Sequence, residues 1–476
     1  MGIFKAYDIR GEYGTELTVE DALRVGYSFG EWLKERGYAK KKLVSVGGDV
    51  RLSTAPLKSA LISGLLSSGF DVIDLGMVPT PTLYFSVAHM GLDGGAMITA
   101  SHLPSKYNGI KLVRPGGIAL SYETGIGDVE KLCSAPHTYG AEIGKPKELG
   151  GVMDFYWAFI KQASKLSDST ALSVAVDSGN GTCGYFADAL RGEGYTVYPL
   201  FQEPNGTFPN HVPDPLREEN LLSLKKTVIE KGADVGIAFD GDGDRIGVVD
   251  NLGRHVSSDQ LLALLASQEL EGNPGGLIVH DVLASSIVDE VVKAKGGRVL
   301  VSRTGHSYIN SAVIEKGALM AGEVSGHIYY LDGYYGFDDA SFAALKVLDL
   351  VAKAKARGQD LAELVNALPV VYSSPEFRLP CPEDKKALVI SKLVDRLSSQ
   401  GYKLSTIDGV RVDADFGWGI VRPSNTEPVL ALRFEGKDEA SLKRIESIFA
   451  PTIAEVLGVD LPAARTIFLF TALKYS

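Results

Sequence analysis

Short apolar runs, each followed by a turn and then by an amphipathic stretch, recur along the chain. Such runs begin at Leu43 (LVSVGGD), Leu172 (LSVAVDSGNGT) and Gly276 (GLIVHD), and each precedes apolar positions spaced as on a helix. Strands that alternate with helices are typical of βαβ units. The pattern therefore predicts an α/β architecture with mostly parallel sheets.

Turn-forming residues cluster at three places along the chain, at residues 140–151, 250–253 and 368–382. A chain of 476 residues is long enough for three or four domains of ordinary size. We therefore expect four domains, which comprise residues 1–150, 151–253, 254–368 and 369–476.

The last of these domains differs in pattern from the other three. It has a helical stretch over residues 385–399, strand-like runs around Gly409 and Val429, and a second helix from about Asp438. This order predicts an α+β domain at the C-terminal end.

Charge and composition exclude several classes of partner. The net charge of −11 argues against nucleic acid, whose binding needs a basic surface, and no apolar run is long enough for a membrane span. The three cysteines lie far apart, and the start MGIFKAYDIRG lacks the apolar core of a signal peptide. We expect a cytoplasmic protein without membrane partners. Both a monomer and a homo-oligomer are compatible with these features.

A polar turn after an apolar run places Ser101 beside His102 in the segment MITASHLPSKYNGIK. Taken alone, such a serine is more often a capping residue of a loop than a nucleophile. Neighbouring side chains in sequence do not make a catalytic triad.

Three carboxylates follow another apolar run in ADVGIAFDGDGDRIG, where Asp240, Asp242 and Asp244 alternate with glycines. Three such charges in one turn repel one another unless a cation is bound, and carboxylate oxygens suit Mg²⁺. An EF-hand loop is excluded, because Arg245 and Asn251 stand where that loop needs Gly and Glu. We expect a metal site here.

Two further segments offer groups for a polar ligand. In GEVSGH, the side chains of Glu323, Ser325 and His327 alternate, so an extended segment would turn all three to one side. The segment RPSNTEP, which begins at Arg422, offers a guanidinium, hydroxyls, an amide and backbone N–H groups. That inventory suits a phosphate, although a capping turn has nearly equal odds.

Together, TASHLPSKYNGIK, DGDGDR, GEVSGH and RPSNTEP resemble the α-D-phosphohexomutase superfamily, specifically its phosphomannomutase/phosphoglucomutase group. The four motifs occur in order, and the resemblance covers essentially the whole chain. Further matching segments are KAYDIRG at Lys5, PNGTFPNHVPDP at Pro204, RTGH at Arg303, YYGFDD at Tyr334 and FGWGIVRPSNTEPVLALR at Phe416.

The resemblance implies three related mixed-sheet α/β domains plus a C-terminal α+β domain around a central cleft. It implies reversible phosphoryl transfer between hexose 1-phosphate and hexose 6-phosphate, with mannose or glucose as the sugar. The transfer would use a phosphoserine and a hexose 1,6-bisphosphate intermediate, which also serves as activator, and one Mg²⁺ in each active site.

The resemblance also assigns roles to residues. Ser101 is the phosphorylated residue, and Mg²⁺ is held by Asp240, Asp242, Asp244 and a phosphate oxygen on Ser101. Glu323 and Ser325 hold sugar hydroxyls, and the substrate's other phosphate is held by Arg422, Ser424, Asn425 and Thr426. Lys111 belongs to the cleft by the same resemblance, and the chemistry of the transfer leads us to expect that it manages the proton of the attacking hydroxyl. The remaining residues of the cleft are Arg10, Arg245 and His327, which we expect to be catalytic, and Tyr7 and His306, which we expect to bind substrate.

Two positions depart from the group's pattern. Leu103 stands where many members have Asn, so a polar contact near the phosphoserine is expected to be absent, and Leu283 stands where relatives often carry Lys. The phosphoglucosamine mutase branch remains an alternative, although it usually has Gln in place of Val324. A non-catalytic sugar-phosphate-binding relative is a second alternative, which the presence of Ser101 and the aspartates disfavours.

Overall fold

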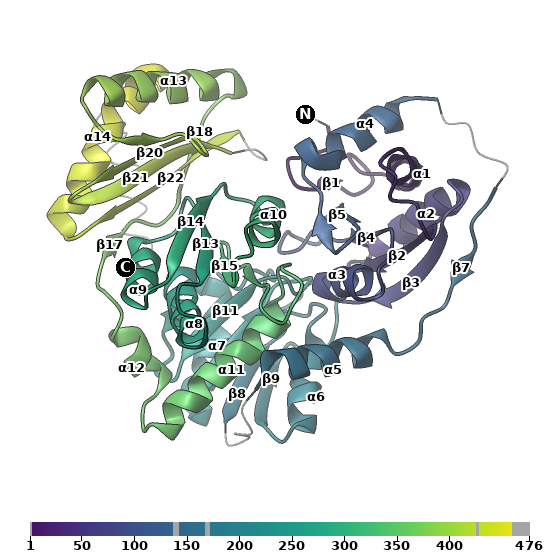
Figure 1. Cartoon of the computed structure of the whole chain (residues 1–476), viewed down its shortest axis with the longest axis horizontal. Helices are drawn as coiled ribbons and strands as arrows, with labels where there is room; N and C mark the ends of the chain where they lie inside the picture. The colour runs from purple at the N-terminus through teal and green to yellow at the C-terminus, as the bar shows by residue number, and fades with distance from the viewer. Residues whose placement is uncertain (1, 137–141, 167–171, 425–427, 459–476) are drawn as a thin grey trace.

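The computed structural model describes residues 2–136, 142–166, 172–424 and 428–458. Its strands form four separate sheets, each accompanied by helices from the same stretch of chain (Figure 1). In Figure 1 the N-terminal unit lies at the right and the C-terminal unit at the upper left, with the other two between and below them. The predicted order of three α/β units and one α+β unit is confirmed.

The N-terminal sheet has a parallel centre, in which β2 pairs with β3 and β4, and antiparallel pairing of β5 with β4 and β1. Its strands, in spatial order, are β1 (Ile9–Glu12), β5 (Tyr107–Arg114), β4 (Gly94–Ile98), β2 (Leu43–Gly48), β3 (Asp71–Met77) and β7 (Pro146–Lys147), with β6 (Ile118–Ala119) beside β5. Its helices are α1 (Val19–Glu35), α2 (Thr54–Ser67), α3 (Thr80–His89), the π-helical turn η1 (Tyr122–Ile126) and α4 (Gly127–Ser134).

The second and third sheets repeat this mixture of parallel and antiparallel pairs. The second runs β12 (His255–Val256), β11 (Ile246–Asp250), β10 (Val235–Phe239), β8 (Ser173–Asp177) and β9 (Thr196–Leu200), with α5 (Val152–Ser164), α6 (Gly184–Gly192) and α7 (Glu218–Lys231). The third runs β14 (Arg298–Ser302), β13 (Leu277–Asp281), β15 (Met320–Gly322) and β16 (Ile328–Tyr330). Its helices are α8 (Ser258–Gly272), α9 (Ser286–Ala294), α10 (His306–Lys316), α11 (Ala340–Ala356) and α12 (Leu361–Asn366). Strand β12 extends the second sheet just beyond the expected boundary at residue 253.

The C-terminal sheet is antiparallel throughout. Its order is β17 (Tyr372–Ser373), β22 (Val429–Gly436), β21 (Gly417–Pro423), β20 (Val410–Ala414) and β19 (Leu404–Ser405), with β18 (Phe377–Pro380) also beside β22. Two helices, α13 (Glu383–Ser399) and α14 (Glu439–Leu457), pack on it. Asp438 caps α14 by accepting from the N–H of Ser441, which explains why this helix begins where the sequence predicted.

One large apolar core joins the first three units, whereas the C-terminal unit has a core of its own. A small cluster connects the third unit to the fourth: Val282 and Leu283 pack against Trp418 and Ile420. Leu283 is only 2% exposed, so its side chain belongs to this contact between units. Within the described residues, no helix combines the length and the apolar character needed to cross a membrane.

Candidate active site

The predicted residues gather where strands of three different sheets end. Ser101 follows β4, Asp240 follows β10 and Glu323 follows β15, and each of these strands has a parallel neighbour. In α/β sheets, loops at the carboxyl ends of parallel strands commonly form ligand sites. Here the loops meet in space, because Ser101 contacts Asp240 and the Asp244 Oδ1 atom lies 3.7 Å from His327 Nδ1.

Ser101 occupies a strained turn that aims its hydroxyl at the aspartates. Its φ of 51° lies in the left-handed region, which is unfavourable for a residue with a β-carbon. Its backbone N–H donates to Thr99 Oγ1 at 2.9 Å, and its hydroxyl donates to Asp240 Oδ2 at 2.6 Å. The expected phosphorylation site is thus placed directly against the expected metal loop.

Arg51 lies outside every motif identified from the sequence. It stabilises this turn through hydrogen bonds. Its side chain is fully buried, and its Nε donates to Asp49 Oδ2 at 2.9 Å. Its two terminal nitrogens donate to four carbonyl oxygens of the serine loop, those of Ser101 (2.8 Å), Leu103 (2.6 Å), Pro104 (2.8 Å) and Tyr107 (3.1 Å). The donors of both terminal nitrogens therefore bond to the loop, and the remaining donor, Nε, bonds to Asp49.

The aspartates alternate with glycines for steric reasons. A Cβ on Gly241 would lie 2.6 Å from the carbonyl oxygen of Ser101. Gly243 has a φ of +74°, and a Cβ there would lie 2.5 Å from Cys183 Sγ. Only glycine at both positions lets three carboxylates share so tight a turn beside the serine loop.

The carboxylates are fully buried, and Lys111 faces two of them. Its Nζ donates to Asp242 Oδ2 at 2.9 Å and to Asp244, while Thr80 Oγ1 donates to Asp242 Oδ2 at 2.6 Å. Burial opposes the charge of Lys111, but Asp242 and Asp244 outweigh it and hold the pKa of Lys111 well above its usual range. Burial and the neighbouring charges of Asp244 and Asp242 raise the pKa of Asp240.

The donor set fits a hard divalent cation. Oxygen atoms of Asp240, Asp242 and Asp244 lie within 4.8 Å of one another. The Oδ1 atoms of Asp242 and Asp244 are buried and have no hydrogen-bond partner within the part of the chain that the structure describes. Buried carboxylate oxygens without partners are costly, and a bound cation would remove that cost.

His327 and Arg245 form the next layer of the site. Arg245 Nε donates to His327 Nε2 at 3.0 Å, and His327 Nδ1 lies 2.8 Å from Asp338 Oδ2. Because Nε2 accepts a hydrogen bond, the proton of a neutral His327 resides on Nδ1, the ring nitrogen that lies near Asp338. Asp338 lies in the segment YYGFDD, and the sequence predicted no role for this residue.

Arg10 and Arg245 both act electrostatically on His102 in the serine loop. Burial lowers the pKa of His102 well below its usual range, and the charges of Arg245 and Arg10 lower it further. Arg10 also forms an ion pair with Asp8. A local cationic cluster therefore exists inside a chain of net negative charge.

The prediction that GEVSGH is extended is wrong, because this segment is the turn between the antiparallel strands β15 and β16. The Glu323 N–H donates to the His327 carbonyl at 3.0 Å, and Gly326 has a φ of +86°. Glu323 is held by Tyr329, whose hydroxyl donates to Oε1 at 2.5 Å, and by the N–H of Gly305, which donates to Oε2 at 3.1 Å. Ser325 Oγ is buried, without a hydrogen-bond partner among the described residues.

Tyr7 and His306 bring the first and third units together. The Tyr7 hydroxyl donates to the Thr304 carbonyl at 2.9 Å, and its ring meets the His306 ring edge-on at 6.0 Å between centroids. Burial lowers the pKa of His306 to about 4, which keeps this imidazole neutral at physiological pH.

The C-terminal unit brings Arg422 to the same region. Arg422 is the penultimate residue of β21, is 8% exposed, and donates from Nε to Asp408 Oδ2 at 2.9 Å. Asp408 also accepts from the N–H of Thr304 in the third unit at 3.3 Å. The Ser424 N–H donates to the Val429 carbonyl at 3.0 Å. Asn425 and Thr426 lie outside the described residues.

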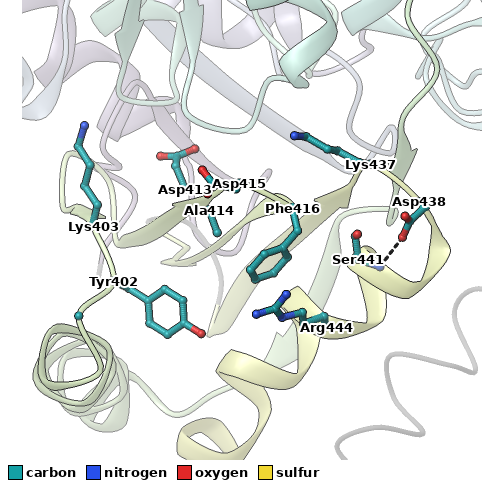
Figure 2. Close-up of a pocket in the computed structure, with 11 residues that line it drawn as sticks. Tyr402, Lys403, Asp413, Ala414, Asp415, Phe416, Lys437, Asp438, Ser441 and Arg444 are labelled. Carbon is teal, nitrogen blue, oxygen red and sulfur yellow. Dashed lines mark hydrogen bonds between the residues drawn. The ribbon is translucent and has the colours of Figure 1, made fainter.

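An open hollow of about 550 Å³ lies on the C-terminal unit, between the end of α13, the β20–β21 turn and the start of α14 (Figure 2). Its lining includes Asp413, Asp415, Phe416 and Arg444, with the Arg444 guanidinium 3.8 Å from the Phe416 ring centroid. None of the residues predicted from the sequence line it. The hollow is therefore separate from the candidate active site.

Known proteins resemble this chain over nearly its whole length. It is 41% identical over 456 residues to the phosphomannomutase/phosphoglucomutase of Pseudomonas putida, which covers 95% of this chain and 96% of that protein. It is 37% identical over 460 residues to a phosphoglucomutase of Neisseria gonorrhoeae, with 95% and 96% covered. A crystal structure of a phosphoglucomutase/phosphomannomutase family protein from Burkholderia thailandensis matches with a TM-score of 0.87 and 36% identity, covering 96% of this chain and 98% of that one.

Family models match each of the four units in turn. Domains I, II and III of "Phosphoglucomutase/phosphomannomutase, alpha/beta/alpha" match residues 1–134, 154–253 and 257–372. The model of the C-terminal domain matches residues 376–451. These matches fall in the expected order on the four sheets described above. The chain belongs to the phosphoglucomutase/phosphomannomutase family.

Proposed function

We propose that this protein interconverts hexose 1-phosphates and hexose 6-phosphates, with mannose or glucose as the sugar, through a phosphorylated Ser101. The observation that carries the proposal is the 2.6 Å hydrogen bond from Ser101 Oγ to Asp240 Oδ2, inside a buried cluster of three aspartates. A phosphate on Ser101 would stand beside these carboxylates, so a cation between them is required to offset the repulsion. The names of the relatives, which mention mannose and glucose, agree with this substrate class.

Asp240, Asp242 and Asp244 would hold one Mg²⁺, together with an oxygen of the Ser101 phosphate. When bound, this ion would withdraw charge from the phosphoryl group and so favour its transfer. In the transfer itself, a sugar hydroxyl oxygen bonds to phosphorus while the bond from phosphorus to Ser101 Oγ breaks; overall, the sugar hydroxyl gives up its proton and Ser101 Oγ takes one up, so that Ser101 is left as a neutral hydroxyl. Arg10, Arg245 and Lys111 supply positive charge around the phosphoryl oxygens.

The environment of Lys111 bears on its expected role as acceptor of the hydroxyl proton. Its bonds to Asp242 and Asp244 keep it in the ammonium form, and an ammonium group cannot accept a proton. Lys111 could serve as the base only after those bonds are released. With the bonds in place, it contributes charge and position rather than proton transfer.

The first transfer yields a hexose 1,6-bisphosphate and a free Ser101. Transfer of the other phosphate back to Ser101 then releases the isomeric monophosphate. The bisphosphate would also act as an activator, because it can transfer a phosphoryl group to an unphosphorylated Ser101. Arg422 and Ser424, together with Asn425 and Thr426, would grip whichever phosphate is not reacting, and Glu323 and Ser325 would hold sugar hydroxyls.

The test is turnover of mannose 1-phosphate and glucose 1-phosphate by the wild-type protein and by Ser101→Ala. We expect the wild type to convert both sugars and to carry a phosphate adduct in its intact mass. The Ser101→Ala protein should fold but lack both activity and adduct. A wild type that binds sugar phosphates without converting them would instead be a binding relative, and a preference for glucosamine phosphate would assign it to the phosphoglucosamine branch.

A further inference from the structure

We propose that Asp408 is a positioning residue, which links the expected phosphate contact of Arg422 to the loop that holds Glu323. This inference rests on the proposed function, since it concerns turnover of a hexose phosphate. Asp408 lies in the turn between β19 and β20, and its side chain is 8% exposed. No motif recognised in the sequence contains it.

One oxygen of Asp408 joins two units of the molecule. Oδ2 accepts from Arg422 Nε at 2.9 Å and from the backbone N–H of Thr304 at 3.3 Å. Arg422 belongs to the C-terminal unit, whereas Thr304 lies between β14 and α10 of the third unit. The carboxylate therefore fixes the guanidinium relative to the neighbouring unit.

The geometry leaves the two terminal nitrogens of Arg422 unbonded to Asp408. The bond to Asp408 uses Nε, so this carboxylate does not engage Nη1 or Nη2, the pair of nitrogens that can bind an oxyanion in parallel. An arginine held at Nε also loses less side-chain entropy when it binds an anion. Asp408 thus orients the guanidinium and occupies neither of its terminal nitrogens.

The turn that carries Asp408 is pressed against the strand that carries Arg422. Gly409 has a φ of +84°, and a Cβ at this position would lie 2.3 Å from the carbonyl oxygen of Val421 and 2.6 Å from the Cα of Arg422. Close backbone packing therefore sets the distance between Asp408 and Arg422.

At its other end, the link reaches the sugar-binding turn through two consecutive peptide groups. The Thr304 N–H donates to Asp408, and the next N–H, of Gly305, donates to Glu323 Oε2 at 3.1 Å. The Thr304 carbonyl also accepts from the Tyr7 hydroxyl at 2.9 Å. A displacement of Arg422 and Asp408 would therefore also displace the loop that positions Glu323.

Steady-state kinetics with glucose 1-phosphate can separate this role from simple stabilisation of the fold. We expect Asp408→Ala to lower kcat/KM by about 10- to 100-fold, mainly through KM, as for loss of a charge-assisted hydrogen bond. Ser101 should remain phosphorylated. Asp408→Asn should recover part of the loss, because its amide oxygen can accept from both Arg422 Nε and the Thr304 N–H.

A double-mutant cycle tests whether Asp408 acts through Arg422. In an Arg422→Ala background, Asp408→Ala should lower kcat/KM by less than about threefold, because the guanidinium that Asp408 positions is absent. The matched control is Asp415→Ala, which removes an exposed carboxylate from the β20–β21 turn of the same unit (Figure 2). This control should keep kcat/KM within about twofold of wild type.

Additive losses in the cycle, or a lower melting temperature with an unchanged KM, would overturn the role of Asp408. If Asp408→Ala does not fold, the same cycle is run with Asp408→Asn, and the same non-additivity is expected at smaller amplitude. A wild type without turnover would refute the proposed function instead. The cycle would then be measured as binding of glucose 6-phosphate by calorimetry, where additive losses would again refute the link.

Discussion

The guanidinium of Arg51 donates from one nitrogen, Nη2, to the carbonyl oxygens of both Ser101, at 2.8 Å, and Leu103, at 2.6 Å. The left-handed turn at Ser101 is unfavourable by itself, so the surrounding structure has to impose it. Arg51 does so from a position fifty residues earlier in the chain. The backbone geometry of the expected phosphorylation site therefore depends on a side chain that touches no substrate.

We expect Arg51→Lys to lower kcat by at least about tenfold, because one ammonium group cannot replace a fork that bonds four carbonyls and Asp49. The KM for glucose 1-phosphate should change less, since the sugar-binding groups are elsewhere. Arg36→Lys is the control, because Arg36 is half exposed and pairs with Asp128 on the surface. Equal kcat in the two variants would show that the serine loop holds its shape without Arg51.

Asp242→Asn should weaken Mg²⁺ binding and reduce turnover strongly, because one of three ligand charges is lost. Removal of metal with EDTA should have the same effect on the wild type, and added Mg²⁺ should restore the rate. A magnesium titration of both proteins measures the shift. If enzyme verified to be free of metal worked at full rate, the three aspartates would need another explanation.

Stability should depend on pH through Asp281, at the end of β13. Burial and the nearby charge of Glu323 raise the pKa of Asp281 to about 7. Between its usual pKa and 7, the folded protein holds a proton that the unfolded chain has released. The free energy of unfolding therefore falls as pH rises through this range, by roughly 4 kcal/mol at most.

Asp281→Asn does not titrate and can still accept the hydrogen bond from Thr304 Oγ1. The melting temperature of Asp281→Asn, relative to that of the wild type, should therefore increase as the pH rises from 5 to 8. Asp413→Asn is the control, since Asp413 is 55% exposed and should show no such trend. A constant difference between Asp281→Asn and wild type across this range would mean that Asp281 stays ionised.

Chain length, clusters of turn residues and apolar runs were sufficient to predict four units and the two turns that bear Ser101 and the aspartates. Those features are local, because a buried strand followed by polar or glycine-rich residues is visible within about fifteen positions. The supports of the site are not local. Arg51 bonds to Ser101, 50 positions later in the chain, and Asp408 bonds to Thr304, 104 positions earlier, so no short window of sequence contains both partners.

The error at GEVSGH has a physical cause as well. Alternating polar and other residues fit a strand as well as a turn, and only the positive φ at Gly326 distinguishes the two. The packing partner of Leu283 could not be predicted either, because an apolar residue in a loop gives no sign of which unit will cover it. In the structure its neighbour is Trp418, more than a hundred positions later.

Substrate choice should follow from the way Glu323 is held. Tyr329 and the Gly305 N–H fix both oxygens of this carboxylate, so its direction is set before a sugar binds. A site built for particular hydroxyls rejects a sugar that presents them wrongly, because its own polar groups are then left unpaired.

Glucose 1-phosphate and mannose 1-phosphate, which share the 3- and 4-hydroxyls, should have kcat/KM values within a factor of about ten. Galactose 1-phosphate, inverted at carbon 4, should be slower than glucose 1-phosphate by roughly a hundredfold or more, and amino sugars should lag behind glucose.

Tyr329→Phe provides the sharpest test of this specificity, because it removes the 2.5 Å bond to Glu323 Oε1 but leaves the ring in the core. We expect the variant to lose activity on glucose 1-phosphate and to discriminate less against galactose 1-phosphate, since a less fixed carboxylate can adapt to either epimer. Tyr330→Phe is the matched control, because Tyr330 is buried on the same strand and faces the other side of the sheet. The comparison is the ratio of kcat/KM for the two sugars in each protein. An unchanged ratio in Tyr329→Phe, or efficient use of galactose 1-phosphate by the wild type, would remove Glu323 from its assigned role.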